Sequence, residues 1–289
     1  REISLKEANQ TLISLIPNRE RVEVVAHFRP ISLCTVHYKC VTKVLAMRLR
    51  GVMNDLISPF QSSFIKGRCI QDNIVVGQEI LHIMRKNRSK KGLMAMKIDL
   101  EKAYDRISWP FLRQVLLDAG IGMDLVEVII DCVSSVSYSV LWNGAKTEFF
   151  SPLRGIRQGD PLSPLLFVMC MDRLSHMICD AVDDGRWEPI HVTRGGPKVS
   201  HLMFADDLLL FGVASERQAT CMMNCLQEFM RASGGRVNVD KSSMFFSPRV
   251  PLHSKRQIQA LTRMQISSEI GRYLGFPLSQ NKRSKEKFH

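Results

Sequence analysis

Two adjacent aspartates, Asp206 and Asp207, lie between two apolar runs in the segment His201–Phe211. Apolar runs on either side of a short polar pair are typical of two antiparallel strands joined by a tight turn. Folding alone gives no reason for two acids there, because two-residue turns favour Asn-Gly or Asp-Gly and neighbouring carboxylates repel each other. The pair therefore predicts a β-hairpin that presents both carboxylates at its tip for a chemical purpose.

A third carboxylate, Asp99, ends the strand-like run Leu93–Ile98. A lone aspartate in a loop is usually a turn residue, but strand ends are rigid and can hold three acids close together. A divalent cation removes the repulsion among such acids, and their hard oxygen atoms suit Mg²⁺, with Mn²⁺ as the alternative. Asp99, Asp206 and Asp207 are thus the candidate ligands of a two-metal phosphoryl-transfer site.

The bulk composition limits the class of protein and of partner. A chain of 289 residues with 45% hydrophobic positions can bury the core of one large domain or of two closely packed ones. Its net charge of +12 favours a polyanionic partner, either nucleic acid or an acidic membrane surface.

No apolar run approaches the roughly 18 residues that a membrane helix requires, so we expect no membrane-spanning segment. The eight cysteines show no paired spacing with histidine, which argues against a zinc module and favours a reducing compartment.

Periodicity predicts a mixture of strands and helices along the chain. The dipeptide Asn143-Gly144 between two strand-like runs is a strong hairpin signal. Strands are expected over 12–17, 28–33, 93–98, 136–142, 146–150, 199–213 (as a hairpin), 237–241 and 244–246. Helices are expected over 39–53, 72–84, 109–119, 124–133 and 217–232, and a further long apolar helix is expected to end near residue 182. This order predicts an α+β fold, in which a palm-like sheet has helices packed on one face.

Several segments resemble, in order, the motifs of reverse transcriptases. The palm motifs correspond to Lys97-Ile-Asp-Leu-Glu-Lys-Ala-Tyr-Asp-Arg106, Gly155-Ile-Arg-Gln-Gly-Asp-Pro-Leu-Ser-Pro164 and Phe204-Ala-Asp-Asp207, and further matches lie at 28–33, 61–68, 237–242 and 273–275. The chain is most similar to the plant type of non-LTR, LINE-type retrotransposon enzymes, from about Leu12 to Leu278. The resemblance implies a palm with a ferredoxin-like sheet, fingers, and an RNA-directed DNA polymerase that adds dNTPs to a primer 3′-OH on an RNA template.

The resemblance also implies roles for single residues, with the three aspartates as the catalytic, metal-binding carboxylates. Tyr104 matches an aromatic residue that crowds the 2′ position of the incoming nucleotide, where a ring leaves no room for a 2′-hydroxyl. Gln158 matches a glutamine that touches this nucleotide, and Gly159 lets the backbone approach closely.

The other nucleotide-facing candidates are basic. They are Arg157, for phosphate contact, Lys241, as the palm lysine near the triphosphate, and Arg29, Lys66 and Arg68, as fingers residues that face the phosphates. Asp105 and Asp160 also match motif positions, where we expect them to cap or orient loops rather than to bind metal.

The same resemblance predicts the domain organisation. Residues 1–92 are expected to form a fingers-like region, and 93–289 a palm with a fingers loop at 145–165 and a primer-side turn near 273–275. The chain begins with Arg1 inside a polar helical pattern, so we expect a fragment of a longer protein, truncated before the family's thumb. An endonuclease domain and a nucleic-acid-binding module are expected in the full-length element, and a nuclear or cytoplasmic location follows from the family alone.

Two other functions share these features. A domesticated or decayed copy would hold RNA through its positive charge without synthesis, and a splicing factor of the intron-maturase type would share the palm. The intact carboxylates favour the polymerase, whereas a missing thumb favours the RNA-binding protein. Nucleotide-dependent binding of Mg²⁺ or Mn²⁺ that is lost on Asp206→Asn distinguishes the enzyme from the binder.

Overall fold

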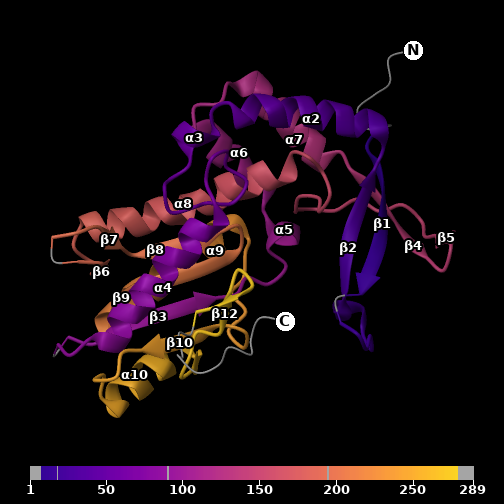
Figure 1. Ribbon diagram of the computed structural model, residues 1–289. Coiled ribbons are helices and arrows are strands. Elements are labelled where there is room, and N and C mark those ends of the chain that lie inside the picture. The colour runs from indigo at the N-terminus through magenta and orange to yellow at the C-terminus, as the bar shows by residue number, and fades with distance from the viewer. Residues whose placement is uncertain (1–7, 18, 90, 194, 279–289) are drawn as a thin grey trace. The chain divides into compact units, whose positions relative to one another are not determined.

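The computed structural model describes residues 8–278 apart from 18, 90 and 194, and the chain passes repeatedly between two compact units (Figure 1). The first unit contains the described residues of Arg1–Ile57, Lys102–Cys170 and Ala232–Gly235, and the second contains those of Ser58–Glu101, Met171–Arg231 and Arg236–His289. This division differs from the one expected at residue 92. Residues 58–92 belong to the unit that carries Asp99, because their helix packs on the sheet of that unit. The last part of the expected palm, 279–289, lies outside the described residues.

The first unit contains a mixed four-stranded sheet. Its strands are β1 (Gln10–Pro17), β2 (Phe28–Cys34), β4 (Ser137–Trp142) and β5 (Ala145–Lys146), in the order β2-β1-β4-β5. β1 runs antiparallel to β2 and parallel to β4. The expected hairpin turn joins β4 to β5, with positive φ angles at Asn143 (48°) and Gly144 (81°). These angles explain the dipeptide, since asparagine and glycine tolerate this conformation best.

Helices make up the rest of the first unit. They are the short 3-10 helix η1 (Val25–His27), α2 (Val36–Arg50), α3 (Met53–Leu56), α5 (Ala103–Arg106), α6 (Trp109–Asp118), α7 (Met123–Ser134) and the first part of α8 (Ser163–Asp183). α2 begins three residues before the expected start because Thr35 caps it: its hydroxyl accepts a hydrogen bond from the Tyr38 amide at 3.3 Å. α6 ends as expected before Gly120, whose φ of 75° suits glycine.

The second unit is built on a five-stranded sheet. Its strands are β3 (Leu93–Ile98), β8 (His201–Phe204), β9 (Asp207–Val213), β10 (Ser243–Phe246) and β11 (Gln265–Ile266), in the order β11-β10-β3-β9-β8. β3 lies in the centre and is antiparallel to both neighbours. The expected strand 237–241 is wrong: only Val237 bridges to Leu100, and the chain then turns, since the Ser242 amide donates back to the Asn238 carbonyl at 3.0 Å.

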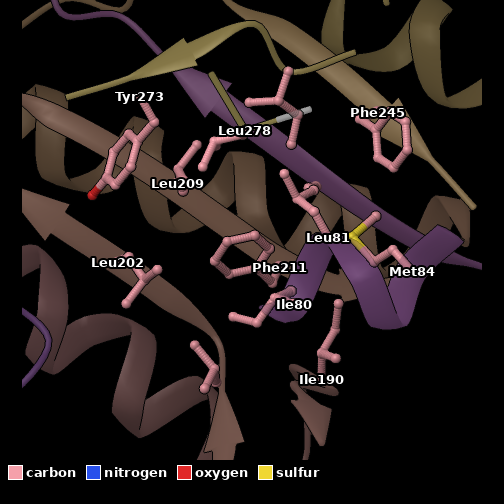
Figure 2. Packing of buried hydrophobic residues seen from close by; sticks show 13 residues of the cluster. Ile80, Leu81, Met84, Ile190, Leu202, Leu209, Phe211, Phe245, Tyr273 and Leu278 are labelled. Carbon is pink, nitrogen blue, oxygen red and sulfur yellow. The ribbon is translucent and has the colours of Figure 1, made fainter. Parts of the chain in front are cut away.

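Apolar side chains cover both faces of this sheet. Figure 2 shows one cluster, in which Ile80 and Leu81 of α4 (Ile70–Lys86) pack with Leu209 and Phe211 of β9. The next residue of β9, Gly212, points to the opposite face, where a Cβ atom would lie 2.5 Å from the Met222 Cε of α9 (Glu216–Ser233). The α+β palm architecture agrees with the expectation, but helices lie on both faces rather than on one.

The second unit is completed by the remaining short elements. They are α10 (Leu252–Thr262) and the two small hairpins β6 (Ile190–His191) with β7 (Lys198–Val199) and β12 (Arg272–Tyr273) with β13 (Phe276–Pro277). The second hairpin confirms the expected turn at 273–275, with Leu274 and Gly275 at positive φ. No helix in the described part of the chain combines the length and hydropathy that a bilayer crossing demands. All eight cysteines are free thiols.

A buried histidine lies in β8 of the second unit. His201 is fully buried, with one ring nitrogen 2.7 Å from the Ser175 hydroxyl and the other 2.9 Å from the Ser200 hydroxyl. The Phe60 ring lies against it, with ring centroids 4.3 Å apart. Burial lowers the pKa of His201 from 6.5 to about 3, because the charged imidazolium is poorly solvated there. The imidazole is therefore neutral at physiological pH.

We expect this histidine to make the protein acid-sensitive. As the pH falls below 6.5, His201 becomes protonated in the unfolded state, whereas in the folded state it stays neutral down to about pH 3. Stability is thus complete above pH 6.5 and is lost progressively below it, by about 2 kcal/mol at pH 5 for this one group. Chemical denaturation from pH 7 to pH 5 measures the slope, which His201→Gln should flatten. An unchanged slope in this variant would show that other groups cause the acid sensitivity.

Candidate active site

The turn between β8 and β9 carries the acidic pair. Phe204 pairs with Asp207 in the antiparallel register, so the connection consists of only two residues, Ala205 and Asp206. Ala205 has a positive φ of 53°, which is uncommon outside glycine, asparagine and aspartate. The hairpin confirms the expectation, with one refinement: exposed Asp206 lies in the turn, whereas Asp207 is the first residue of β9.

Asp99 reaches the same end of the sheet from the central strand. It directly follows Ile98, whose partner is Leu208, and Asp207 directly precedes Leu208. Residues at such opposed positions of adjacent antiparallel strands have Cβ atoms about 5 Å apart. The fold therefore brings Asp99 and Asp207 to neighbouring positions, with Asp206 one residue away in the turn.

Both backbone polar groups of Asp99 are held by the segment before β10. The Asp99 amide donates to the Ser242 hydroxyl at 3.1 Å, and the Asp99 carbonyl accepts from the Asn238 amide at 2.8 Å. The Ser242 hydroxyl in turn donates to the Asn238 carbonyl at 2.7 Å. Nothing in the sequence marked Ser242 or Asn238 for this task, because the contact depends on how the turn folds back on β3.

The carboxylates disturb one another electrostatically. Burial is the main cause that raises the pKa of Asp99, and the nearby charge of Asp206 raises it further. Burial also raises the pKa of Asp207, with added repulsion from Asp206 and Asp99. Lys241 and Lys97 oppose the shift at Asp99, and Lys97 does so at Asp207. The structure thus brings the predicted lysine Lys241 near the acids and adds Lys97, which the sequence analysis missed.

The carboxylate oxygens of Asp99, Asp206 and Asp207 could supply some, but not all, of the ligands of a hard divalent cation. Among the described residues, no three His, Cys, Asp or Glu side chains form a group that could hold a metal ion by themselves. Mg²⁺ is usually bound by one or two carboxylates together with water and substrate phosphates rather than by a complete protein cage. Half-buried acids that repel one another fit this mode, because a cation offsets both the burial and the repulsion.

A second group of predicted residues lies in the first unit. The Tyr104 ring stacks on Phe167, with centroids 4.4 Å apart and planes 12° apart, and the Tyr104 carbonyl accepts from the Ile156 amide at 2.9 Å. Two residues later, the Gln158 carbonyl accepts from the Ser32 amide of β2 at 2.8 Å. The loop that carries Gln158 is thus held to Tyr104 and to the sheet, and both side chains remain partly exposed.

Gly159 makes a close approach within the first unit. Its φ is 110°, and a Cβ atom at this position would lie 2.9 Å from the Ser32 carbonyl oxygen. Glycine is therefore required by the contact of the loop with β2. This packing requirement does not depend on a bound nucleotide.

Arg157 does not have the exposed position that phosphate contact requires, so that prediction is wrong. It is 2% exposed, and its guanidinium donates to Asn9, Thr11, the Tyr38 hydroxyl and the Cys132 carbonyl. Asp160 lies 3.8 Å away and compensates its charge. Asp160 also accepts from the Leu162 amide at 3.1 Å, so it orients the loop as expected.

The fingers candidates differ from one another in their surroundings. Arg68 donates from its guanidinium to the carbonyls of Ser58 and Gln61, so it braces its own loop, and the prediction that it faces phosphates finds no support in this geometry. Lys66 and Arg29 are exposed, Lys66 in the second unit and Arg29 on β2 of the first. Both positions are compatible with the predicted phosphate contacts and do not test them.

Comparisons with known proteins agree with this architecture. Residues 16–278 match the family model described as reverse transcriptase (RNA-dependent DNA polymerase). The chain is 28% identical over 282 residues to the transposon TX1 uncharacterized 149 kDa protein of Xenopus laevis, which covers 94% of this chain and 21% of that protein. It is 27% identical over 226 residues to the retrovirus-related Pol polyprotein from the type-2 retrotransposable element R2DM of Drosophila melanogaster, covering 78% and 20% of the two chains. The chain therefore spans about a fifth of the length of these relatives.

Solved structures share the fold at low sequence identity. The apo telomerase of Candida tropicalis truncated from its C-terminal domain superposes with a TM-score of 0.59 at 15% identity, over 84% of this chain and 51% of that chain. Telomerase from Candida albicans in complex with a fragment of telomeric RNA gives a TM-score of 0.57, also at 15% identity, over 83% and 42% of the two chains.

The α+β palm presents carboxylates at the ends of adjacent strands, and the family match covers nearly the whole chain. The chain therefore belongs to the reverse transcriptase family of RNA-directed DNA polymerases. Its relatives among the TX1 and R2 elements place it with the non-LTR retrotransposon proteins, as the motifs indicated.

Proposed function

We propose that this chain is the polymerase domain of a retrotransposon protein and adds dNTPs to a DNA primer 3′-OH on an RNA template. The single observation that supports this best is the convergence of Asp99, Asp206 and Asp207 at one end of the central sheet. Burial and neighbouring negative charge disfavour the charged forms of Asp99 and Asp207, so this arrangement does not stabilise the fold by itself. Phosphoryl transfer needs such acids, because its catalysis consists largely of positioning and charge neutralisation.

Each group has a definite task in this proposal. Asp99, Asp206 and Asp207 would hold Mg²⁺ or Mn²⁺, which when bound lowers the pKa of the primer hydroxyl and neutralises charge on the leaving pyrophosphate. Lys241, exposed and electrostatically coupled to Asp99, would bind the triphosphate. The partly exposed side chains of Tyr104 and Gln158 would contact the sugar and base of the incoming nucleotide.

Primer extension on an RNA template with dNTPs and Mg²⁺ tests the proposal directly. The wild-type chain should extend the primer and Asp206→Asn should not, although the exposed position of Asp206 in the turn leaves folding unaffected. Product from both proteins would contradict the assignment of the acids. If neither protein extends the primer and both bind RNA–DNA duplex equally, the chain is either an RNA-binding protein of the domesticated type or an enzyme that needs the downstream region of its parent protein, and adding that region separates the two.

Tyr104→Ala should weaken the discrimination of the enzyme between dNTP and rNTP substrates. The Tyr104 ring is fixed by its stack on Phe167, so its edge can exclude a 2′-hydroxyl by contact. We expect the preference for dNTP over rNTP to fall about 10- to 100-fold, the range of a single steric contact. Single-nucleotide incorporation kinetics with paired dNTP and rNTP substrates measures this ratio. Tyr104→Phe is the control, since it keeps the ring and should keep the selectivity; equal selectivity in the alanine variant would rule out the steric role.

A further inference from the structure

A short segment before α4 lies along the outer edge of the hairpin that carries the acids. Gln61 forms a parallel bridge with Met203 of β8. The Met203 amide donates to the Phe60 carbonyl at 2.9 Å, and the Ser62 amide donates to the Met203 carbonyl at 3.2 Å. This contact fixes the segment beside β8, two residues before the turn.

From this position two side chains hold the amide of Ala205. That amide donates both to the Gln61 Oε1 atom at 3.0 Å and to the Ser63 Oγ atom at 2.8 Å. The Ser63 hydroxyl in turn donates to Gln61 Oε1 at 2.8 Å, and the Ser63 amide donates to the same oxygen at 3.1 Å. Gln61 and Ser63 therefore form one connected acceptor for a single N–H group, the one that immediately precedes Asp206.

The contact is buried and directional. Gln61 is 0% exposed and Ser63 is 1% exposed, so water does not compete for the Ala205 amide. The two backbone donors at the glutamine oxygen determine the orientation of its amide, and its Nε2 atom finds no hydrogen-bond partner among the described residues. A buried donor without a partner is unfavourable, and folded proteins retain such groups mainly where another need outweighs the cost.

That need is evident in the backbone of the turn. Ala205 adopts a left-handed conformation, with φ of 53°, which its Cβ atom disfavours. Strained backbone of this kind persists only where the surroundings hold it, and it is common at functional sites. The conformation at Ala205 sets the direction of the chain into Asp206 and the start of β9 at Asp207.

We infer that Gln61 and Ser63 are positioning residues, which hold the Ala205 amide and thereby aim the Asp206 and Asp207 carboxylates for metal binding. The inference rests on the proposed polymerase function and adds two residues to its machinery. Neither side chain touches the substrate in this role. They act on catalysis only through the geometry of the turn, as the outer partners of metal ligands do in other proteins.

Two single substitutions each remove one acceptor of the Ala205 amide while keeping side-chain volume nearly constant. Ser63→Ala removes the hydroxyl, and Gln61→Met replaces the amide by an apolar chain of similar length. We expect each to weaken Mn²⁺ binding and to lower kcat about 10- to 100-fold, the usual effect of losing an outer partner of a metal ligand. The KM for dNTP should change little, because the nucleotide contacts proposed for Tyr104 and Gln158 are untouched. Ser63→Thr keeps the hydroxyl and should restore both values.

The same unit offers a matched control at the other end of β3. The Ser247 hydroxyl, also 0% exposed, accepts a hydrogen bond from the Leu93 amide at 2.9 Å. Ser247→Ala therefore removes the same kind of buried contact from the same sheet, at the strand end opposite Asp99. A merely structural role of Ser63 predicts equal effects of the two alanine variants on all measurements.

The test is Mn²⁺ titration of the protein in the presence of a fixed concentration of dNTP by electron paramagnetic resonance, together with primer-extension kinetics over a range of Mg²⁺ concentrations. Weaker Mn²⁺ binding and lower kcat in Ser63→Ala and Gln61→Met, but not in Ser247→Ala, support the inference. If wild type binds Mn²⁺ through its aspartates and Ser63→Ala matches Ser247→Ala, the positioning role is wrong while the polymerase proposal stands. If wild type binds no Mn²⁺ that depends on Asp207, the metal site and the positioning role are both wrong. Should Ser63→Ala fail to fold, Gln61→Met and Ser63→Thr decide the comparison.

Discussion

Replacing Asp207 with asparagine is expected to abolish DNA synthesis and, at the same time, to raise the melting temperature of the protein. The loss of activity should be about 10³-fold or more, because metal ions at such sites supply several kcal/mol of transition-state stabilisation and each 1.36 kcal/mol corresponds to a factor of ten. An uncharged amide in the same volume removes a metal ligand but changes no packing. Primer extension measures the first effect.

The gain in stability follows from the sign of the pKa shift. Burial and the charges of Asp206 and Asp99 raise the pKa of Asp207, so the folded protein disfavours its ionised form more than the unfolded chain does. At neutral pH this carboxylate therefore destabilises the fold, and the cost disappears as the pH falls through the raised pKa. Asparagine should remove the cost, so its stabilising effect is present at pH 7 and absent at low pH.

Asp183→Asn is the matched control for this prediction. Asp183 ends α8 in the same unit and is exposed, so its replacement should change neither activity nor melting temperature measurably. Thermal melts of the three proteins at pH 7 and at pH 4 give the comparison. An Asp207→Asn variant less stable than wild type at pH 7 would show that the carboxylate makes favourable contacts that outweigh its repulsion.

Arg157→Ala is expected to destabilise the fold by about 3–5 kcal/mol, the usual effect of breaking a buried ion pair from one side. The loss leaves Asp160 buried without its compensating charge and removes the arginine donor from the Asn9 side-chain oxygen and the Tyr38 hydroxyl. Burial already raises the pKa of Asp160, and Arg157 opposes this shift, so removing the arginine raises that pKa further. The destabilisation should therefore be largest at neutral pH and smaller at acidic pH, where the carboxyl takes up a proton. Urea denaturation at pH 7 and pH 5 measures both values.

An exposed ion pair in the same unit provides the control. The Arg113 guanidinium and Glu127 pair on the surface, where their side chains are 38% and 51% exposed. Arg113→Ala should destabilise the fold far less than Arg157→Ala, because water and salt screen exposed pairs. The double variant Arg157→Met with Asp160→Leu should recover part of the loss, since apolar residues can replace a buried pair. Equal costs for Arg157→Ala and Arg113→Ala would contradict the structural role of Arg157.

The sequence by itself determined the elements and the identity of the acids. Most of the strands and long helices, and the two tight turns at Asn143-Gly144 and Ala205-Asp206, follow from local periodicity and turn chemistry, which depend on neighbouring residues only. The assignment of Asp99 and the acidic pair to one site required only their places at strand ends. The family motifs identified Tyr104 and Gln158 as candidate nucleotide-binding residues, and their contacts with the nucleotide remain predictions.

Tertiary structure decided which polar side chains have a structural partner. Arg157 and Arg68 are basic residues in motif segments, like Lys66, and only packing shows that the first is buried against Asp160 and the second bound to carbonyl groups of its own loop. Gln61 and Ser63 reach Ala205 across more than 140 positions of sequence. Ser242 likewise reaches Asp99 through a turn that periodicity misread as a strand. Such contacts depend on chain segments that meet only after the sheet has formed, so no local pattern contains them.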